Sequence, residues 1–212
     1  MAKKLLSVAI AAALLGGGVF LGTQLGGDNS ATIVGGADRY AKSDNKTAAV
    51  GALAKSVGAS GKGQVIEVKA GDSIQAAVRA AKPGDVIRVF PGTYKETVYI
   101  DKDDILITGV IENGQWPTME GERKLNDAIL YSGNNITVEN LLITHYKGNA
   151  IMGQAGNNFL IRNNRIVDTG VYGIFPQLGK NGLISNNIVS GIEDAAIYVG
   201  MSDNVHVNNN EV

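Results

Sequence analysis

The C-terminal half of the chain repeats its pattern of apolar and polar positions about every 23 residues. Three apolar columns carry this repeat over four copies: Val138, Ile161, Ile184 and Val207; Ile143, Ile166, Val189 and Val212; and Ile129, Ile151, Ile174 and Ile197. Two asparagine columns run in step with them: Asn140, Asn163, Asn186 and Asn209, and Asn135, Asn158, Asn181 and Asn204. Five columns in one register indicate a structural repeat.

Each copy contains three short stretches in which apolar and polar residues alternate, separated by polar turns. Alternation with a period of two is typical of strands that bury one face. A single copy could not bury that face alone, so we expect successive copies to stack around one continuous core. The pattern therefore predicts an all-β fold, a right-handed single-stranded parallel β-helix with about 23 residues per coil.

The asparagine columns have a structural explanation. Identical amides stacked at one turn can hydrogen-bond from coil to coil, and asparagine tolerates the left-handed backbone of a sharp turn. We therefore expect an asparagine ladder along the stack. We also expect Asn163 to contribute a buried amide to it, so that its loss leaves polar groups unpaired.

The segment before the repeats predicts a cap for one end of the core. A helix is expected to begin at Asp72 or Ser73 and to run to about Ala81, with its apolar residues on one face. Such a helix would cover the open end of a stacked core. Residues 111–125 form a polar excursion longer than a normal turn and contain Trp116, and long loops often carry function.

The N-terminal part of the chain divides into two further zones. Two lysines precede an uncharged run over residues 5–27, which predicts that residues 1–27 are a cleaved signal peptide or a retained membrane anchor. Residues 28–63 are rich in small and polar residues and predict a flexible linker before the β-helix of residues 64–212. Both interpretations of the first zone imply a periplasmic or extracellular protein, released or anchored in the inner membrane.

The amino-acid composition excludes several classes of ligand, metal site and catalytic nucleophile. A net charge of −1 and a charged fraction of 18% argue against binding to nucleic acid through phosphate neutralisation. The absence of cysteine excludes disulfides, cysteine-ligated metals and thiol nucleophiles, and two histidines leave little room for a histidine metal site. We therefore expect no metal and no other cofactor, with calcium bound by turn carboxylates as the alternative.

Three short motifs resemble the opening module of bacterial right-handed β-helix proteins. They are Gly71-Asp72-Ser73-Ile74-Gln75-Ala76-Ala77, then Lys82-Pro83-Gly84-Asp85, then Pro91-Gly92-Thr93-Tyr94. That group includes pectin-lyase-like enzymes, mannuronan epimerases and the accessory proteins of nitrous oxide reductase, and the later coils resemble exported β-helix repeat proteins. The resemblance covers about residues 65–212 and implies the fold rather than one activity.

The first strand of each coil offers a candidate recognition surface. Its isoleucine column is expected to point inward, so that its neighbours point outward. The predicted ligand-binding residues are Leu130, Met152, Gln154, Tyr172, Phe175, Gln177 and Tyr198. Aromatic faces suit sugar rings and amides suit sugar hydroxyls, although another segment of the protein could instead cover this stripe.

One motif bears on catalysis. Tyr172-Gly173-Ile174-Phe175-Pro176-Gln177 resembles the Tyr-Gly-Phe-Asp-Pro-His motif of mannuronan epimerases, but Phe175 and Gln177 replace the two residues that transfer protons. This difference argues against an enzyme. Asp168 and Asp194, in turns beside the first strand, are the remaining candidates for catalysis or calcium binding, with solvated turn acids as the alternative.

Three functions follow from these features. The leading hypothesis is an exported protein that recognises a polysaccharide or another cell-envelope polymer along the first-strand face. The second is a lyase, hydrolase or epimerase acting on acidic glycans, and the third is a structural or accessory envelope protein that binds a protein partner. The chain stops at Val212 within the repeat pattern, so we expect a longer β-helix or end-to-end strand pairing with another chain.

Overall fold

The computed structural model describes residues 20–23, 31–34 and 56–212. The chain divides into two compact units, residues 1–51 and residues 52–212. In the first unit, β1 (Phe20–Thr23) and β2 (Ala31–Val34) pair in antiparallel orientation. The rest of the predicted signal or anchor, and residues 28–30 and 35–55 of the predicted linker, lie outside the described residues. Within the described part, no helix is long and apolar enough to cross a bilayer.

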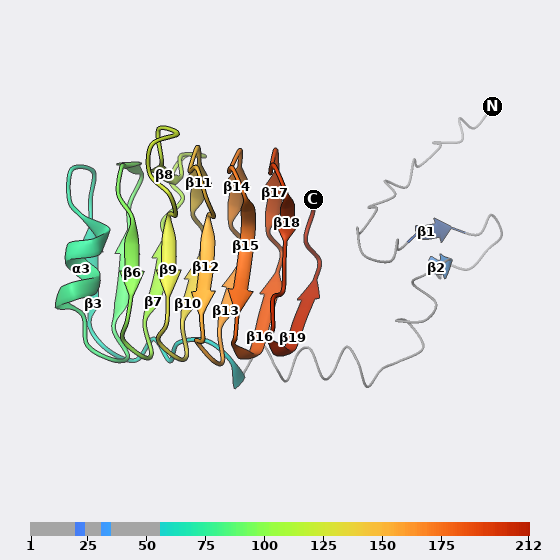
Figure 1. Cartoon of the computed structure of the whole chain (residues 1–212), viewed down its shortest axis with the longest axis horizontal. Coiled ribbons are helices and arrows are strands. Elements are labelled where there is room, and N and C mark those ends of the chain that lie inside the picture. Colours follow the sequence, from blue (N-terminus) through green and yellow to red (C-terminus); the bar gives the residue numbers. More distant parts are fainter. Residues whose placement is uncertain (1–19, 24–30, 35–55) are drawn as a thin grey trace, which may run out of the picture. The chain divides into compact units, whose positions relative to one another are not determined.

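The second unit is a stack of coils in which each full coil contributes one strand to each of three sheets (Figure 1). Sheet 1 contains β6 (Val98–Ile100), β9 (Ile129–Tyr131), β12 (Ile151–Gln154), β15 (Tyr172–Gln177) and β18 (Ala195–Ile197). Sheet 2 contains β3 (Val65–Val68), β4 (Val86–Val89), β7 (Leu106–Gly109), β10 (Thr137–Glu139), β13 (Leu160–Arg162), β16 (Lys180–Ser185) and β19 (Asp203–Asn208). Sheet 3 contains β5 (Gly92–Tyr94), β8 (Pro117–Glu120), β11 (Leu142–Thr144), β14 (Arg165–Val167) and β17 (Ile188–Ser190).

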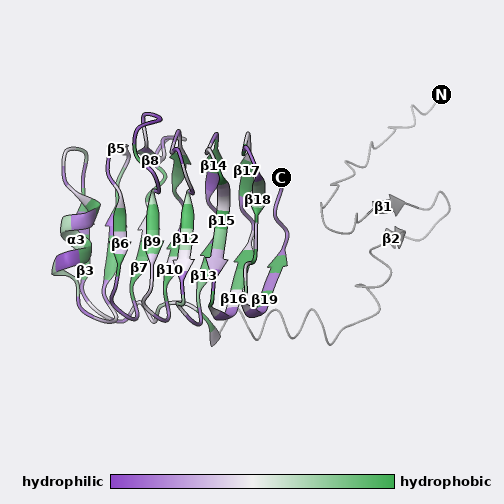
Figure 2. Ribbon diagram, in the orientation of Figure 1, coloured by the Kyte–Doolittle hydropathy of each residue, from purple (hydrophilic) through white to green (hydrophobic). Residues whose placement is uncertain are grey.

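All strand pairs of the three sheets are parallel, and their register confirms the predicted columns. Ile151 pairs with Ile174 in sheet 1, Ile161 with Ile184 in sheet 2, and Ile166 with Val189 in sheet 3. These five isoleucines and Val189 are at most 1% exposed, because each strand turns alternate residues into the core. The core is therefore one continuous column of stacked aliphatic side chains, and hydrophobic residues follow the strands in Figure 2.

Asparagine ladders run along the stack, as predicted, but the buried one lies one residue from the expected position. Asn163 and Asn186 adopt positive φ angles of 55° and 57°, and both are exposed. The buried amides belong to the next residue of each turn, in the column Asn164, Asn187 and Asn210. The prediction for Asn163 is therefore wrong: it turns the backbone, and the residue that follows points into the core.

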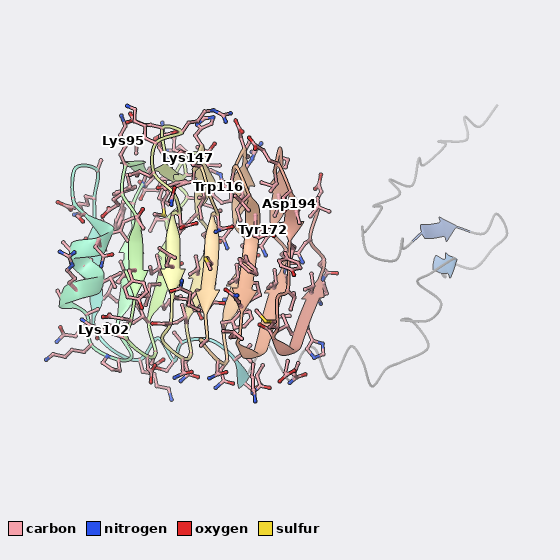
Figure 3. All side chains as sticks on the ribbon, in the orientation of Figure 1. Lys95, Lys102, Trp116, Lys147, Tyr172 and Asp194 are labelled. Carbon is pink, nitrogen blue, oxygen red and sulfur yellow. The ribbon has the colours of Figure 1, made fainter. Side chains whose placement is uncertain are left out.

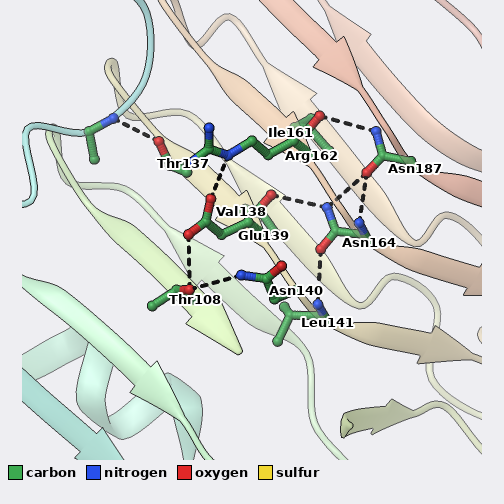
Figure 4. A network of polar contacts seen from close by, with 11 residues as sticks. Thr108, Thr137, Val138, Glu139, Asn140, Leu141, Ile161, Arg162, Asn164 and Asn187 are labelled. Carbon is green, nitrogen blue, oxygen red and sulfur yellow. Dashed lines mark hydrogen bonds and ion pairs between the residues drawn. The ribbon is translucent and has the colours of Figure 1, made fainter. Parts of the chain in front are cut away.

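The buried ladder repeats one set of contacts in each coil (Figure 4). The amide nitrogen of Asn164 donates to the carbonyl of Val138, and that of Asn187 donates to the carbonyl of Ile161. The Oδ1 atom of Asn187 accepts from both the backbone and the side-chain nitrogen of Asn164, at 3.0 and 3.1 Å. A second, more exposed ladder joins the side chains of Asn135, Asn158, Asn181 and Asn204.

A short helix covers the first coil, as predicted. Helix α3 (Ile74–Ala80) begins after Ser73, whose hydroxyl accepts a hydrogen bond from the backbone nitrogen of Ala76, and its apolar face is buried on the core. The carboxylate of Glu96 accepts from the first backbone nitrogens of the helix, and the ammonium of Lys102 donates to three carbonyls at its last turn. Side chains from the next coil therefore satisfy both ends of this seven-residue helix.

The predicted excursion over residues 111–125 contains a strand of the stack. Its central residues form β8, which pairs with β5 and β11 in sheet 3 and buries Met119 completely. In the segment Pro-Thr-Met-Glu, buried side chains alternate with half-buried ones. This is the usual alternation of a strand whose outward-facing residues are polar. Only the turns before and after β8 leave the coil. The bridge between Glu112 and Gln115 closes the turn before it.

The C-terminal end of the predicted linker lies against the outer face of sheet 2. Val57 is buried, the backbone nitrogen of Gly58 donates to the carbonyl of Asn158, and that of Ala59 donates to the hydroxyl of Thr137. A Cβ atom on Gly58, which has a φ of 89°, would overlap Leu160 and Thr137. Residues 56–63 therefore belong to the folded unit, because their small side chains let the backbone approach the sheet closely.

Candidate functional site

The outer face of sheet 1 carries one large apolar side chain per coil. Parallel register places Tyr99 beside Leu130, Leu130 beside Met152, and Met152 beside Phe175. Tyr198, the residue directly after β18, continues this column. Tyr99 and Tyr198 are 42% and 46% exposed, and the three between them are half-buried. The predicted column is therefore outward-facing. Tyr99 extends it by one coil; the alternation of Val98-Tyr99-Ile100 was the signal that could have included it.

Three aromatic rings near the last two strands of sheet 1 form a cluster: Tyr172 and Phe175 lie on β15, and Tyr198 directly follows β18. The ring centroids of Tyr172 and Phe175 lie 4.8 Å apart, those of Tyr172 and Tyr198 lie 5.1 Å apart, and those of Phe175 and Tyr198 lie 5.2 Å apart. Phe175 and Tyr198 are stacked, with an interplanar angle of 25°. Parallel strands lie about 4.8 Å apart, so residues at equivalent positions on neighbouring coils bring their rings into contact.

Tyr172 is fixed by its polar neighbours. Its backbone nitrogen donates to the side-chain oxygen of Asn149 at 3.2 Å, and the amide of Asn149 donates to Asp127 at 2.7 Å. Burial raises the pKa of the Tyr172 hydroxyl, and the neighbouring Asp194 carboxylate raises it further, in part as a hydrogen-bond acceptor. Tyr172 and Asp194 are therefore neighbours, and both are labelled in Figure 3.

Two glutamine amides lie beside the aromatic cluster. Gln154 and Gln177 are register partners on β12 and β15, two residues after Met152 and Phe175. Gln154 is exposed and Gln177 is half-buried. Neither side chain makes a hydrogen bond within the part of the chain that the structure describes. Both amides are therefore available to a ligand that lies along the aromatic column.

Residues 98–212 match the family described as the right-handed beta helix region. The chain belongs to the right-handed β-helix family. It is similar to the crystal structure of an alginate lyase from Paenibacillus sp. str. FPU-7, at 18% identity and a TM-score of 0.50, over 68% of this chain and 58% of that enzyme. At this identity the structural likeness concerns the fold alone. No curated protein matches the sequence.

The predicted acidic candidates do not meet in this β-helix. Asp194 lies beside Tyr172, whereas Asp168 contacts Arg123 and the imidazole of His145. His145 Nε2 is 3.5 Å from Asp168 Oδ2, and its Nδ1 is 2.9 Å from Glu120 Oε2. Asp168 therefore belongs to a cluster in the turn that follows sheet 3, in which its carboxylate already contacts Arg123 and His145. Among the described residues, no group of three or more histidine and acidic side chains is arranged to hold a metal ion.

Two further features lie outside sheet 1. Trp116 lines a shallow hollow of about 390 Å³ at sheet 3, together with Pro91, Gly92, Thr93, Gln115 and Thr118. Tyr146, in the turn after β11, is buried and donates its hydroxyl hydrogen to the carbonyl of Glu96. Burial raises the pKa of Tyr146, and its role is to join two coils.

Proposed function

We propose that the outer face of sheet 1 recognises a polysaccharide or a similar cell-envelope polymer that lies across the coils. The observation that carries this proposal is the cluster of Tyr172, Phe175 and Tyr198 beside the free amides of Gln154 and Gln177. Aromatic faces pack against the C–H faces of sugar rings, and amides both donate to and accept from hydroxyls.

The dimensions of sheet 1 suit an extended polymer. Its outward column offers one side chain per coil, at a spacing of about 4.8 Å, which is comparable with the length of one sugar residue in an extended glycan. The shared fold with an alginate lyase supports a carbohydrate ligand, because that enzyme shows that a β-helix of this kind can present a glycan-binding surface. Among the described residues, we find no comparable set of free side chains that would support the other two predicted functions, an enzyme acting on acidic glycans or a protein that binds a protein partner.

Export is part of the same proposal. The uncharged run over residues 5–27 directs the folded unit to the periplasm or beyond, as a cleaved signal or as an anchor. A polymer of the cell envelope would be accessible from either position. Fractionation of cells that express the full chain, followed by N-terminal sequencing of the mature protein, tests both the location and the cleavage.

Binding by the aromatic cluster can be tested with the full chain on a glycan array, followed by titration calorimetry of each polymer that binds. We expect Phe175→Ala and Tyr198→Ala to weaken binding about tenfold each, which corresponds to about 1.4 kcal/mol per stacked ring. The matched control is Ile188→Ala, which removes a side chain that is 45% exposed on sheet 3. Unchanged affinity of both aromatic variants would refute the proposed function.

The same polymers should be tested for cleavage. An absorbance assay for unsaturated products on uronate polymers distinguishes a binding protein from a lyase. We expect no product, because Phe175 and Gln177 carry no group that can transfer a proton and Asp168 is held in a separate ionic cluster. Product formation that depends on Tyr172 would instead establish lyase activity at this face.

A further inference from the structure

Charge is distributed unequally among the three sheets. The five strands of sheet 1 contain no lysine, arginine, histidine, aspartate or glutamate. Strands of sheet 2 carry acidic and basic residues, such as the ion pair between Glu139 and Arg162 at 2.6 Å, and sheet 3 carries Glu120 and Arg165. The candidate binding face is therefore the uncharged face of the stack.

The charged groups that flank the aromatic cluster are carboxylates. Asp194 lies beside the hydroxyl of Tyr172, and Asp127 accepts two hydrogen bonds from Asn149, which in turn holds the backbone of Tyr172. Both acids are part of the framework that positions the aromatic rings. A ligand on these rings therefore lies close to negative charge.

Basic side chains near the ends of sheet 1 are mostly engaged elsewhere. Lys95 pairs with Glu122, Arg123 pairs with Asp168, and the ammonium of Lys102 donates to carbonyls at the end of helix α3. Lys147 has no ion pair within the described residues, but it lies in the turn before β12, and Figure 3 places it at the margin of the sheet. Proteins usually recognise carboxylates with arginine forks or lysines, and the strands of sheet 1 present neither.

We infer that the ligand of the sheet 1 face is an uncharged glycan and that this face discriminates against polyuronates. The inference rests on the proposed function and adds a chemical class to it. Sugar hydroxyls can satisfy the amides of Gln154 and Gln177, and the ring faces can stack on Phe175 and Tyr198. A polyuronate would bring one carboxylate per sugar to strands that carry no cation and lie beside Asp127 and Asp194, so repulsion opposes its binding.

Pairs of ligands with the same backbone, one with free carboxylates and one without, test this inference with the full chain. Polygalacturonate and its fully methyl-esterified form share one backbone, and so do alginate and carboxyl-reduced alginate. We expect the uncharged form of at least one pair to bind tenfold or more tightly than its charged form at low ionic strength. The difference should shrink as salt is added, because screening weakens repulsion at an exposed surface.

A gain-of-function variant provides a second test of the preference for uncharged glycans. Gln154→Lys places a cation on the exposed, uncharged face and should raise the affinity for the polyuronate at least fivefold. Ser190→Lys is the matched control, because it adds the same charge at an exposed position on sheet 3. It should leave the ratio of the two affinities unchanged.

The outcomes separate this inference from the proposed function. Equal or stronger binding of the charged forms, with affinity that Phe175→Ala lowers, would overturn the inference and leave carbohydrate recognition by sheet 1 intact. Binding of either form that Phe175→Ala and Tyr198→Ala do not change would overturn the proposed function, and so would the absence of binding across the whole array. The inference would then fail with the proposed function.

Discussion

Replacement of Asn187 by alanine tests the central element of the stack. Asn187 is fully buried, and its side chain joins three coils: it donates to the carbonyl of Ile161 and to Asn210 Oδ1, and it accepts twice from Asn164. The variant leaves the backbone N–H of Asn164 without its acceptor. An unpaired buried donor costs about 1–3 kcal/mol, and each of the other lost hydrogen bonds contributes about 0.5–1.5 kcal/mol.

We therefore expect Asn187→Ala to lower the free energy of unfolding by about 3–5 kcal/mol, less what water entering the site recovers. That loss is a large part of the 5–15 kcal/mol that typically stabilises a domain, and for a unit of about 150 residues it corresponds to a Tm roughly 6–20 °C lower. Urea and thermal unfolding followed by circular dichroism measure both quantities.

The neighbouring residue provides the control. Asn186 is exposed, has a φ of 57°, and makes no side-chain hydrogen bond within the described residues. Asn186→Gly keeps a residue that adopts this backbone freely, so we expect a change below about 1 kcal/mol. Equal destabilisation by the two variants, or a loss below about 0.5 kcal/mol for Asn187→Ala, would refute the assignment of the buried ladder.

Three further predictions concern the core. Ile161→Asp and Ile184→Asp should abolish folding, because each places a carboxylate in the stacked core, and a wild-type melting curve for either would contradict the register. Tyr131→Phe should leave stability unchanged or raise it by up to about 1 kcal/mol, since the buried Tyr131 hydroxyl has no hydrogen-bond partner among the described residues. A clear loss in urea unfolding would contradict this and indicate a partner, such as a buried water. Burial raises the pKa of Tyr94 and Tyr146 above the value of about 10 expected in the unfolded chain. The stabilisation from these neutral hydroxyls should therefore be fully present below pH 10 and be lost as the pH rises beyond it. A urea midpoint that stays constant up to pH 11.5 would contradict this prediction.

Much of the fold could be predicted because it follows from local periodicity. A period of two places Ile161 and Ile184 in the core, and a constant spacing of 23 residues places each above its equivalent in the previous coil. The capping helix could be predicted as well, since Ser73 and the apolar positions after it are local signals. The excursion over residues 111–125 was harder to interpret, because a four-residue strand between two polar turns has too few apolar residues to show its period.

The buried ladder could not be assigned from the sequence, because Asn163 and Asn164 are adjacent and chemically identical. The backbone turns through the left-handed region at the first of them, and this rotation directs the second into the core. The same limit applies to residues 56–63. Their small residues are equally compatible with a free linker, and only contacts with Thr137 and Asn158, about 80 to 100 positions away, place them on sheet 2.

For the candidate site, the strand period and the repeat were enough to predict which residues face outward from sheet 1, because they set the direction of each side chain. Tertiary structure decided what these residues do together. It brought Tyr172, Phe175 and Tyr198 into one cluster, set Asp194 beside the first of them, and directed Asp168 to a different cluster. The reason is physical: a repeat determines the coil and the face of each residue, whereas contacts between side chains depend on rotamers and turn conformations that vary from one coil to the next.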